Sequence, residues 1–241
     1  MNPDANSKAI ELAQETQKNR YPIYATVWIH PYEIGHGSIQ SYEDIDQQVV
    51  ALTEQLEQYS DFIVAVGEWW IDAHYPEYEK RQDLQKYAFT KQCDLARHYK
   101  LPIVIHSRSN FTDTYAIIKN YADCQIYFHC RWYGPDELTI LVNTFPYLRV
   151  WFCWNVTYPK AKNLQASLQK ARTYQQTQQC KILFETDAPY LAPQQYRWQK
   201  NHPAFIIALY DYAVSYLQVD LSDLQDLIEE NILWLFRITQ R

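Results

Sequence analysis

Short apolar runs alternate with amphipathic segments along almost the whole chain, and this alternation limits the fold more than any other feature. We expect strands at 23–29, 62–66, 101–105, 124–128 and 148–154, and in the run that begins at Ile182. Helices are expected at 2–17, 41–59, 79–100, 111–121, 135–145, 160–178, 203–217 and 221–236. Because mostly apolar strands alternate with helices, the pattern favours an α/β fold with a parallel sheet and helical crossovers.

Six strands of this kind fit either an open doubly wound sheet or an incomplete TIM-like (β/α) barrel. The nucleotide-binding version is disfavoured, because the four glycines, at 35, 37, 67 and 134, form neither GxGxxG nor GxxxxGK. A chain of 241 residues, 47% of them hydrophobic, is able to bury one large core. We therefore predict a single domain over residues 1–241.

The charge balance limits the ways in which this protein can hold nucleic acid. The chain carries 22 Lys and Arg against 28 Asp and Glu, so it is mildly acidic. Non-specific binding of duplex nucleic acid needs a broad basic surface, which this composition does not predict. A DNA or nucleotide substrate would therefore be held locally, by a metal or by a few Arg and Lys residues.

The cysteines and the N-terminal residues indicate the expected compartment. The five cysteines are odd in number and form no CxxC pair, which argues against a disulfide framework and against a thiolate zinc site. We expect them to be small buried hydrophobic residues in a reducing cytosol. The sequence shows neither a signal peptide nor an apolar segment of transmembrane length, so we expect a cytoplasmic protein with no membrane partner and no obligate protein partner.

Four of the expected strands end on a residue that can bind a metal, namely Glu68, His106, His129 and Asp187. The carboxyl ends of parallel strands lie on one side of a sheet, so these side chains are expected to converge. Each residue alone has an ordinary explanation; Asp187, for example, would cap the turn before Pro189. Burying all of them unpaired would cost several kcal/mol each, and a bound divalent cation removes that cost.

The donor set predicts both the metal and the chemistry. Imidazole and carboxylate ligands without thiolate suit Zn, Mn, Ni, Co or Fe, and Mg where carboxylates dominate. One or two such ions generate hydroxide from water near neutral pH and stabilise charge on a phosphoryl or carbonyl oxygen. The residues therefore predict a metal-dependent hydrolase.

Six segments of the chain also resemble a known family, the TatD-type metal-dependent deoxyribonucleases of the amidohydrolase superfamily. The segments are 26–31 (Thr-Val-Trp-Ile-His-Pro), 66–72 (Val-Gly-Glu-Trp-Trp-Ile-Asp), 101–108 (Leu-Pro-Ile-Val-Ile-His-Ser-Arg), 128–130 (Phe-His-Cys), 183–193 (Leu-Phe-Glu-Thr-Asp-Ala-Pro-Tyr-Leu-Ala-Pro) and 201–203 (Asn-His-Pro). They follow the order and spacing of the family from about residue 5 to the C-terminal helix. The resemblance implies a TIM-like barrel and a cytoplasmic hydrolase that cleaves DNA phosphodiester bonds through a metal-activated water.

The resemblance also implies roles for the four residues at the strand ends. Glu68 is similar to the carboxylate that bridges two metals, and His106 and His129 are similar to ligands of the second metal. Asp187 resembles a ligand of the first metal and is a candidate general base, so Glu68 and Asp187 are the expected catalytic residues. Arg108 is a candidate for binding the substrate phosphate, with a structural ion pair as the alternative.

The chain departs from the family pattern at its beginning. Family members begin with a strand that carries His-x-His, and here Met1 falls inside the expected next helix. Three explanations fit this departure: the true start lies further upstream, the protein is a truncated paralogue that has lost the activity, or the enzyme works with the second metal alone. Two alternatives to the deoxyribonuclease therefore stay open, a catalytically impaired remnant that acts as a binding protein and a hydrolase of another phosphoester or amide.

Four aromatic residues are expected near the rim, Trp69, Trp70, Trp132 and Tyr133. Such residues either stack on bases or are packed in the core.

Overall fold

The computed structural model describes residues 3–35, 37–69, 71, 80–106, 110–129 and 133–238. It has a six-stranded sheet with the order β1-β2-β3-β4-β5-β6, and the pairs β1/β2, β2/β3 and β5/β6 are parallel. Among the described residues β1 and β6 are the edges of this sheet. The predicted α/β class with a parallel, TIM-like sheet is confirmed.

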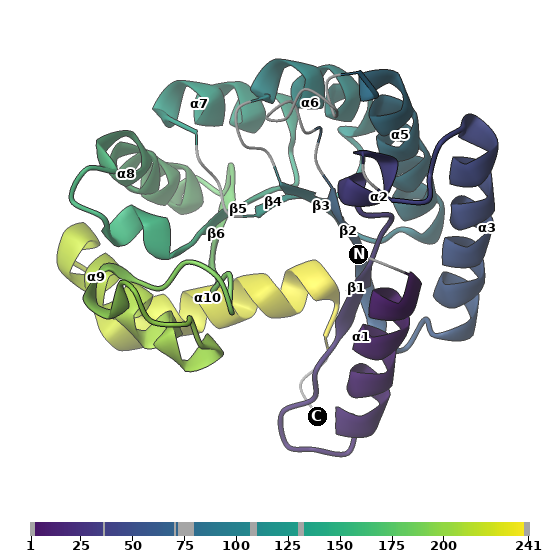
Figure 1. Cartoon of the computed structure of the whole chain (residues 1–241). Coiled ribbons are helices and arrows are strands. Elements are labelled where there is room, and N and C mark those ends of the chain that lie inside the picture. The colour runs from purple at the N-terminus through teal and green to yellow at the C-terminus, as the bar shows by residue number, and fades with distance from the viewer. Residues whose placement is uncertain are drawn as a thin grey trace. The chain divides into compact units, whose positions relative to one another are not determined.

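The contacts within the chain divide it into two compact units, residues 1–126 and 127–241, and the boundary falls inside β4. The N-terminal unit contains the strands β1 (Ala25–Val27), β2 (Ile63–Trp69) and β3 (Ile103–His106). Its helical elements are α1 (Pro3–Thr16), α2 (Pro31–Gly35), α3 (Tyr42–Gln58), α5 (Gln82–Tyr99), α6 (Phe111–Ile118) and η1 (Lys119–Tyr121). Helices α3 and α5 pack on each other, α5 also contacts β2, and α1 contacts β1 (Figure 1).

Helix α3 shows how the sequence fixes an element of the N-terminal unit. The Ser41 side chain accepts a hydrogen bond from the Asp44 backbone N–H, and the Asp44 carboxylate accepts one from the Ser41 N–H. This capping box satisfies backbone donors that the first turn leaves without partners. Ile45, Leu52 and Leu56 recur on one face and are buried, each contributing on the order of 2 kcal/mol through its apolar area.

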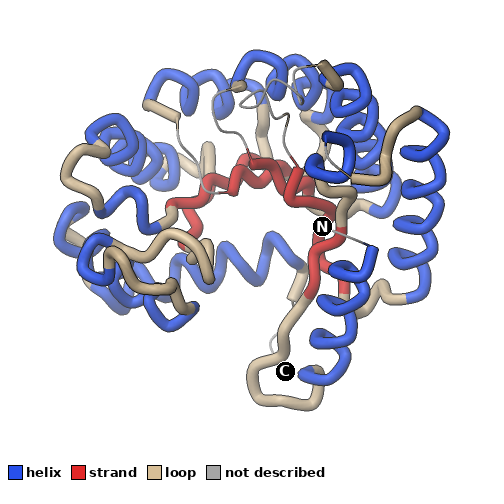
Figure 2. The backbone as a smooth tube through the Cα atoms, viewed as in Figure 1, coloured by secondary structure: helices blue, strands red, loops and turns tan. Residues whose placement is uncertain are grey.

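The C-terminal unit contains β4 (Ile126–His129) from its second residue onward, β5 (Leu148–Phe152) and β6 (Lys181–Phe184). Its helical elements are α7 (Pro135–Thr144), η2 (Trp154–Thr157), α8 (Lys162–Gln176), η3 (Gln194–Tyr196), η4 (Pro203–Phe205), α9 (Ile206–Leu217) and α10 (Leu221–Phe236). Helices α8 and α10 both contact β6, and Figure 2 shows the short strands of this unit flanked by longer helices.

Arg149 is the exception within the apolar strands of the C-terminal unit. It is buried at the start of β5, its Nη1 donates to the Leu148 carbonyl at 3.1 Å, and its guanidinium lies 4.1 Å from the centre of the Trp234 ring. Burial lowers the pKa of Arg149 to about 10. No carboxylate within the described part of the chain pairs with it.

The environments of the cysteines agree with expectation. Cys93, Cys124, Cys153 and Cys180 are buried thiols outside any disulfide, and the fifth, Cys130, lies outside the described residues. Burial raises the pKa of the Cys93 and Cys124 thiols, which favours the unreactive protonated form.

In the described ranges, no single helix has the length and apolar character needed to cross a membrane. The segments Pro203–Leu217 and Leu221–Phe236 meet that test only as a pair, with a bend of 117° between them.

Candidate metal centre

Glu68 takes its position from an unusual backbone at the end of β2. The residue before it, Gly67, has φ +125°, and a Cβ built there would lie 2.3 Å from the Val104 carbonyl oxygen of β3. The pairing of β2 with β3 shifts register in the same place, between Val66 and Trp69. A residue with a side chain would need a conformation that is rare for L-amino acids and would also clash with β3. Glycine is therefore required for Glu68 to stand this close to the neighbouring strand.

His106 ends β3 and pairs with this carboxylate. Its Nδ1 lies 2.7 Å from Glu68 Oε1, and both side chains are only partly exposed, 20% for His106 and 26% for Glu68. The other ring nitrogen of His106, Nε2, is of a type that also binds metals. The N-terminal unit therefore supplies one imidazole and one carboxylate from adjacent strands.

His129 ends β4 and is held by a buried carboxylate. Its Nδ1 lies 2.5 Å from Glu185 Oε2, and the Tyr127 hydroxyl donates to the same oxygen at 2.6 Å. Glu185 is buried with a side-chain exposure of 6%, while Tyr127 stacks on Trp151 with ring centres 4.1 Å apart. Two neighbours thus fix the Glu185 carboxylate, and Glu185 in turn fixes the orientation of the His129 ring.

Asp187 lies near the other nitrogen of this ring, with Oδ1 3.7 Å from His129 Nε2. It is partly exposed and follows β6 by three residues, at the start of a turn in which Tyr190 N–H donates to the Asp187 carbonyl at 2.7 Å. The C-terminal unit therefore presents His129 Nε2 and the Asp187 carboxylate next to each other.

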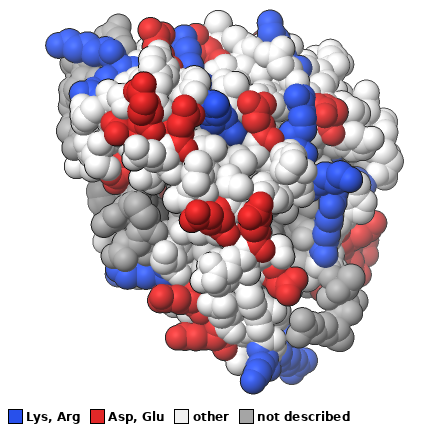
Figure 3. Space-filling model, turned by 90° about the vertical axis from the view of Figure 1, so that its right-hand side faces the viewer, with Lys and Arg blue, Asp and Glu red and all other residues white. Residues whose placement is uncertain are grey.

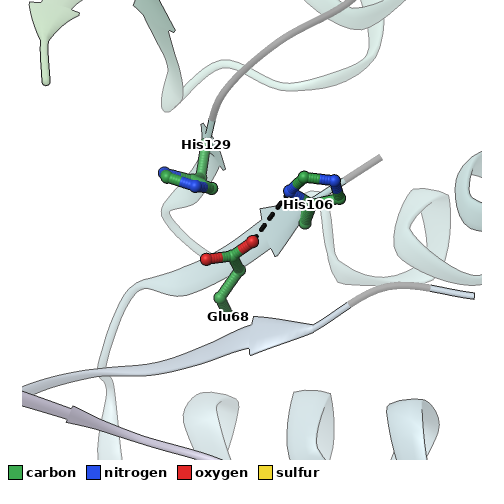
Figure 4. A group of neighbouring side chains, drawn as sticks. All are labelled: Glu68, His106 and His129. Carbon is green, nitrogen blue, oxygen red and sulfur yellow. Dashed lines mark ion pairs between the residues drawn. The ribbon is translucent and has the colours of Figure 1, made fainter. Parts of the chain in front are cut away.

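The ligand atoms of three residues at strand ends, Glu68, His106 and His129, lie within 4.8 Å of one another (Figure 4). In Figure 4 the side chains come from the ends of β2, β3 and β4 and point toward one another. One carboxylate and two imidazoles are the ligand types that first-row divalent metals take in hydrolases. The donors present therefore fit a divalent metal ion.

The sequence did not reveal the parts played by Glu185 and Tyr127. Glu185 stands two residues before Asp187, so the two are expected on the same face of an extended segment, and this spacing was the available signal. Tyr127 stands two residues before His129 in the same way. Their contact joins positions 58 residues apart, which no local pattern predicts.

Other residues that the sequence singled out have other roles or lie outside the described ranges. Arg108, the predicted phosphate contact, is outside the described residues, and so are Trp70 and Trp132. Trp69 and Tyr133 are buried, so they belong to the packed core rather than to a surface for stacking.

Two His-Pro pairs have the same local geometry. His30 Nδ1 accepts from the Tyr32 N–H before α2, and His202 Nδ1 accepts from the Ala204 N–H before η4. In both cases the ring nitrogen takes the place of a capping side chain at the start of a helical turn.

The family model described as TatD related DNase matches residues 1–237 of this chain. An uncharacterized metal-dependent hydrolase of Mycoplasma pneumoniae is 30% identical over 218 residues, which are 88% of this chain and 77% of that protein. The uncharacterized metal-dependent hydrolase YabD of Bacillus subtilis is 25% identical over 234 residues, which are 96% of this chain and 83% of that protein.

Solved structures show the same fold. YjjV, a TatD homolog from Escherichia coli, has a TM-score of 0.83 at 20% identity, with 98% of this chain and 84% of that chain covered. A TatD family hydrolase from Entamoeba histolytica has a TM-score of 0.77 at 19% identity, and 98% of this chain and 82% of that chain are covered.

Proposed function

Because the chain belongs to the TatD-related DNase family, whose relatives are named metal-dependent hydrolases, we propose that it is a hydrolase that cleaves DNA phosphodiester bonds with a bound divalent metal. The convergence of Glu68, His106 and His129 carries this proposal. Such a metal supplies a nucleophilic water near neutral pH and neutralises charge on the phosphoryl oxygens.

Each residue at the strand ends has a part in this chemistry. Glu68, His106, His129 and Asp187 would hold the metal, and Asp187, the partly exposed carboxylate 3.7 Å from His129 Nε2, would accept the proton of the attacking water. Glu185 keeps His129 Nδ1 engaged, so that Nε2 faces the metal. The description of the matching family supports DNA as the substrate.

The experiment measures metal content and turnover of the purified protein. We expect divalent metal by elemental analysis, release of nucleotides from oligodeoxynucleotides, hydrolysis of the model diester bis(p-nitrophenyl) phosphate, and loss of both activities in EDTA. Asp187→Asn and Glu68→Gln are each expected to lower the rate by about a hundredfold or more. Asp46→Asn, which changes an exposed carboxylate on α3 paired with Lys91, is the matched control and keeps the wild-type rate.

Unchanged activity in both site variants would contradict the proposal. A panel with a phosphomonoester and an amide separates the related hydrolases, since turnover of one of these alone assigns that substrate instead. Sub-stoichiometric metal and no turnover with any divalent ion would assign a binding protein.

A further inference from the structure

Two cations stand side by side where the neighbouring strands β5 and β6 begin. Arg149 is the second residue of β5, Lys181 is the first residue of β6, and the two pair in register. Residues in register on parallel strands point their side chains to the same face, with the two backbones roughly 5 Å apart. Like charges in this arrangement repel each other. The pair lies at the amino ends of the strands, whereas His129 and Asp187 stand at the carboxyl ends of β4 and β6.

The chain around these cations is poor in carboxylates. In the stretch 138–210 the acidic residues are Glu185 and Asp187, both at the candidate metal centre. On the face of the N-terminal unit that Figure 3 shows, by contrast, Lys and Arg side chains alternate with Asp and Glu side chains. Within the described ranges neither Arg149 nor Lys181 forms an ion pair, so the protein supplies no counter-charge to them there.

The guanidinium of Arg149 is buried and keeps one edge without a partner. Arg149 is 3% exposed, and its Nη1 donates to the Leu148 carbonyl at 3.1 Å. Its Nε is buried and has no hydrogen-bond partner among the described residues, and neither has Nη2. Nε and Nη2 form the fork that binds two oxygens of a carboxylate or a phosphate side by side. Buried donors of a charged group are costly to leave unsatisfied, and a bound oxyanion removes this cost.

A second donor without a partner lies two residues further along β5. Trp151 is 9% exposed, and its Nε1 is buried with no hydrogen-bond partner in the described part of the chain. Residues i and i+2 of a strand share a face, so this N–H and the Arg149 fork belong to the same side of β5. The Tyr127 ring stacks on the Trp151 ring at 4.1 Å and the Phe236 ring meets it edge-on at 6.3 Å, so aromatic neighbours hold the indole in place. Two side chains therefore offer unsatisfied N–H donors on one side of the strand.

Trp234 on α10 covers the guanidinium on its way to solvent. The guanidinium of Arg149 lies 4.1 Å from the centre of the Trp234 ring, and Trp234 itself is 50% exposed. A ring stacked on the face of a guanidinium leaves the edge with Nε and Nη2 free to bind a ligand in the guanidinium plane. Because partly exposed side chains change rotamer rapidly, movement of this ring admits a small ion to the buried cation.

We infer that Arg149, Trp151 and Lys181 form a binding site for a small oxyanion, a carboxylate or a phosphate, with two of its oxygens in the Nε–Nη2 fork of Arg149. These two kinds of anion share a pair of charged acceptor oxygens, which a guanidinium fork binds bidentately. The anion balances the two adjacent cations and accepts a hydrogen bond from the Trp151 indole. Since the site lies at the amino ends of β5 and β6, it is separate from the candidate metal centre and does not depend on the proposed function.

The test measures the Tm of the full chain in EDTA, with sodium phosphate and sodium acetate as the probes. Sodium chloride at the same ionic strength is the reference, because a single chloride ion does not fill both positions of the fork. A ligand that binds the folded chain alone raises the Tm, and we expect at least one oxyanion, at about 20 mM, to raise it by about 4 °C more than chloride does. A rise with phosphate alone assigns the site to phosphates, and a rise with acetate alone assigns it to carboxylates.

Three variants separate the parts of the site. Arg149→Met removes the fork and is expected to abolish the rise that the oxyanion causes over chloride. Arg149→Lys keeps the charge but not the fork, so we expect it to lose most of the rise. Trp151→Phe keeps an aromatic ring against Tyr127 but removes the N–H, and we expect about a tenfold higher anion concentration to be needed for the same rise.

Arg97→Met is the matched control. Arg97 also lies over an aromatic ring, that of Tyr121, but it is exposed and paired with Asp123, so this variant is expected to respond like the wild type. Equal rises in the wild type and in Arg149→Met would overturn the inference, because exclusion of the anion from the protein surface would then explain both. It would also be overturned by a rise of the same size with chloride, or by no rise in the wild type.

Discussion

The two units use their charged side chains in opposite ways. In the N-terminal unit cations on α5 pair with carboxylates of other segments, with Lys86 3.2 Å from Asp113 on α6, Lys91 3.4 Å from Asp46 on α3 and Arg97 2.6 Å from Asp123 in the turn after η1. In the stretch 138–210 the cations have no such partners within the described ranges, and the two carboxylates stand at the candidate centre. The ion pairs of the first unit connect α5 to neighbouring segments, whereas the cations of the stretch 138–210 form no ion pair within the described ranges.

Two Tyr-Glu pairs show the same contrast. Tyr99 donates to Glu57 at 3.0 Å on the surface of the N-terminal unit, while Tyr127 donates to the buried Glu185 at 2.6 Å in the C-terminal unit. The exposed pair competes with water and contributes little, but in the buried pair no water replaces a partner that is removed. The same residue types therefore have different consequences in the two places.

The two Tyr-Glu pairs give the prediction with the largest expected effect. Glu185→Gln removes the charge next to His129 Nδ1, and we expect the affinity for Zn²⁺ or Co²⁺ to fall by about 10- to 100-fold. Glu57→Gln is the control and is expected to leave the affinity unchanged. The measurement is a titration of metal-free protein against a competing chelator, and equal affinities in the two variants would show that Glu185 has no role in orienting His129.

Two of the arginines that lie over aromatic rings, Arg149 and Arg97, give the next largest effect. Arg149→Met replaces a buried cation by an apolar side chain, so we expect the free energy of unfolding to rise by about 1 kcal/mol even though the cation no longer lies over the Trp234 ring. Arg97→Met removes the ion pair with Asp123 and the cation over the Tyr121 ring, so we expect a decrease of about 0.5–1 kcal/mol. Urea denaturation measures the free energy of unfolding of both variants. A decrease in both would contradict the expected difference between the buried and the exposed arginine.

The smallest effect concerns the start of α3. The backbone N–H of Gln40, followed by the Ser41 hydrogen bonds, lowers the pKa of Asp44 below its usual 3.8. A carboxyl with a lowered pKa in the folded state stabilises the fold above the unfolded value and loses this contribution as pH falls through the folded one. Asp44→Asn is therefore expected to lower the Tm at pH 7, and the difference from the wild type is expected to shrink below pH 3.8. A difference that stays constant down to about pH 2 would exclude the charge as its cause.

Most elements had a local signal and were predicted from it. The strand expected at 101–105 is found as β3, Ile103–His106, and α3 begins next to Ser41, where a capping residue precedes an amphipathic run. The short helix α2 was not expected, and the strand expected at 148–154 ends at Phe152, because Trp154 begins the 3-10 helix η2. Strand β2 is longer than expected and includes Glu68, because Gly67 continues the strand in a conformation that propensity does not anticipate.

The residues of the candidate site that end a strand could be predicted from the sequence. The residues that reach the site through tertiary contacts could not. Glu68, His106, His129 and Asp187 were expected to converge. The ligand atoms of the first three lie within 4.8 Å of one another, and Asp187 lies 3.7 Å from His129. The burial of Glu185 and the exposure of Trp198 depend on which side of each loop faces the protein. Contacts with residues that are distant in the sequence, such as Tyr127 and Tyr158, determine this. A single sequence contains these residues but not their contacts.

The close approach of Gly67 to Val104 has a consequence for motion. The place of Glu68 is set by the spacing of two backbones, and Val66 N–H is already bonded to the Pro102 carbonyl at 3.0 Å beside it. The backbone of Glu68 therefore leaves its position only when β2 separates from β3. In hydrogen exchange, the amides of this ladder should open together with the loss of the Glu68–His106 pair, at a free energy near that of global unfolding.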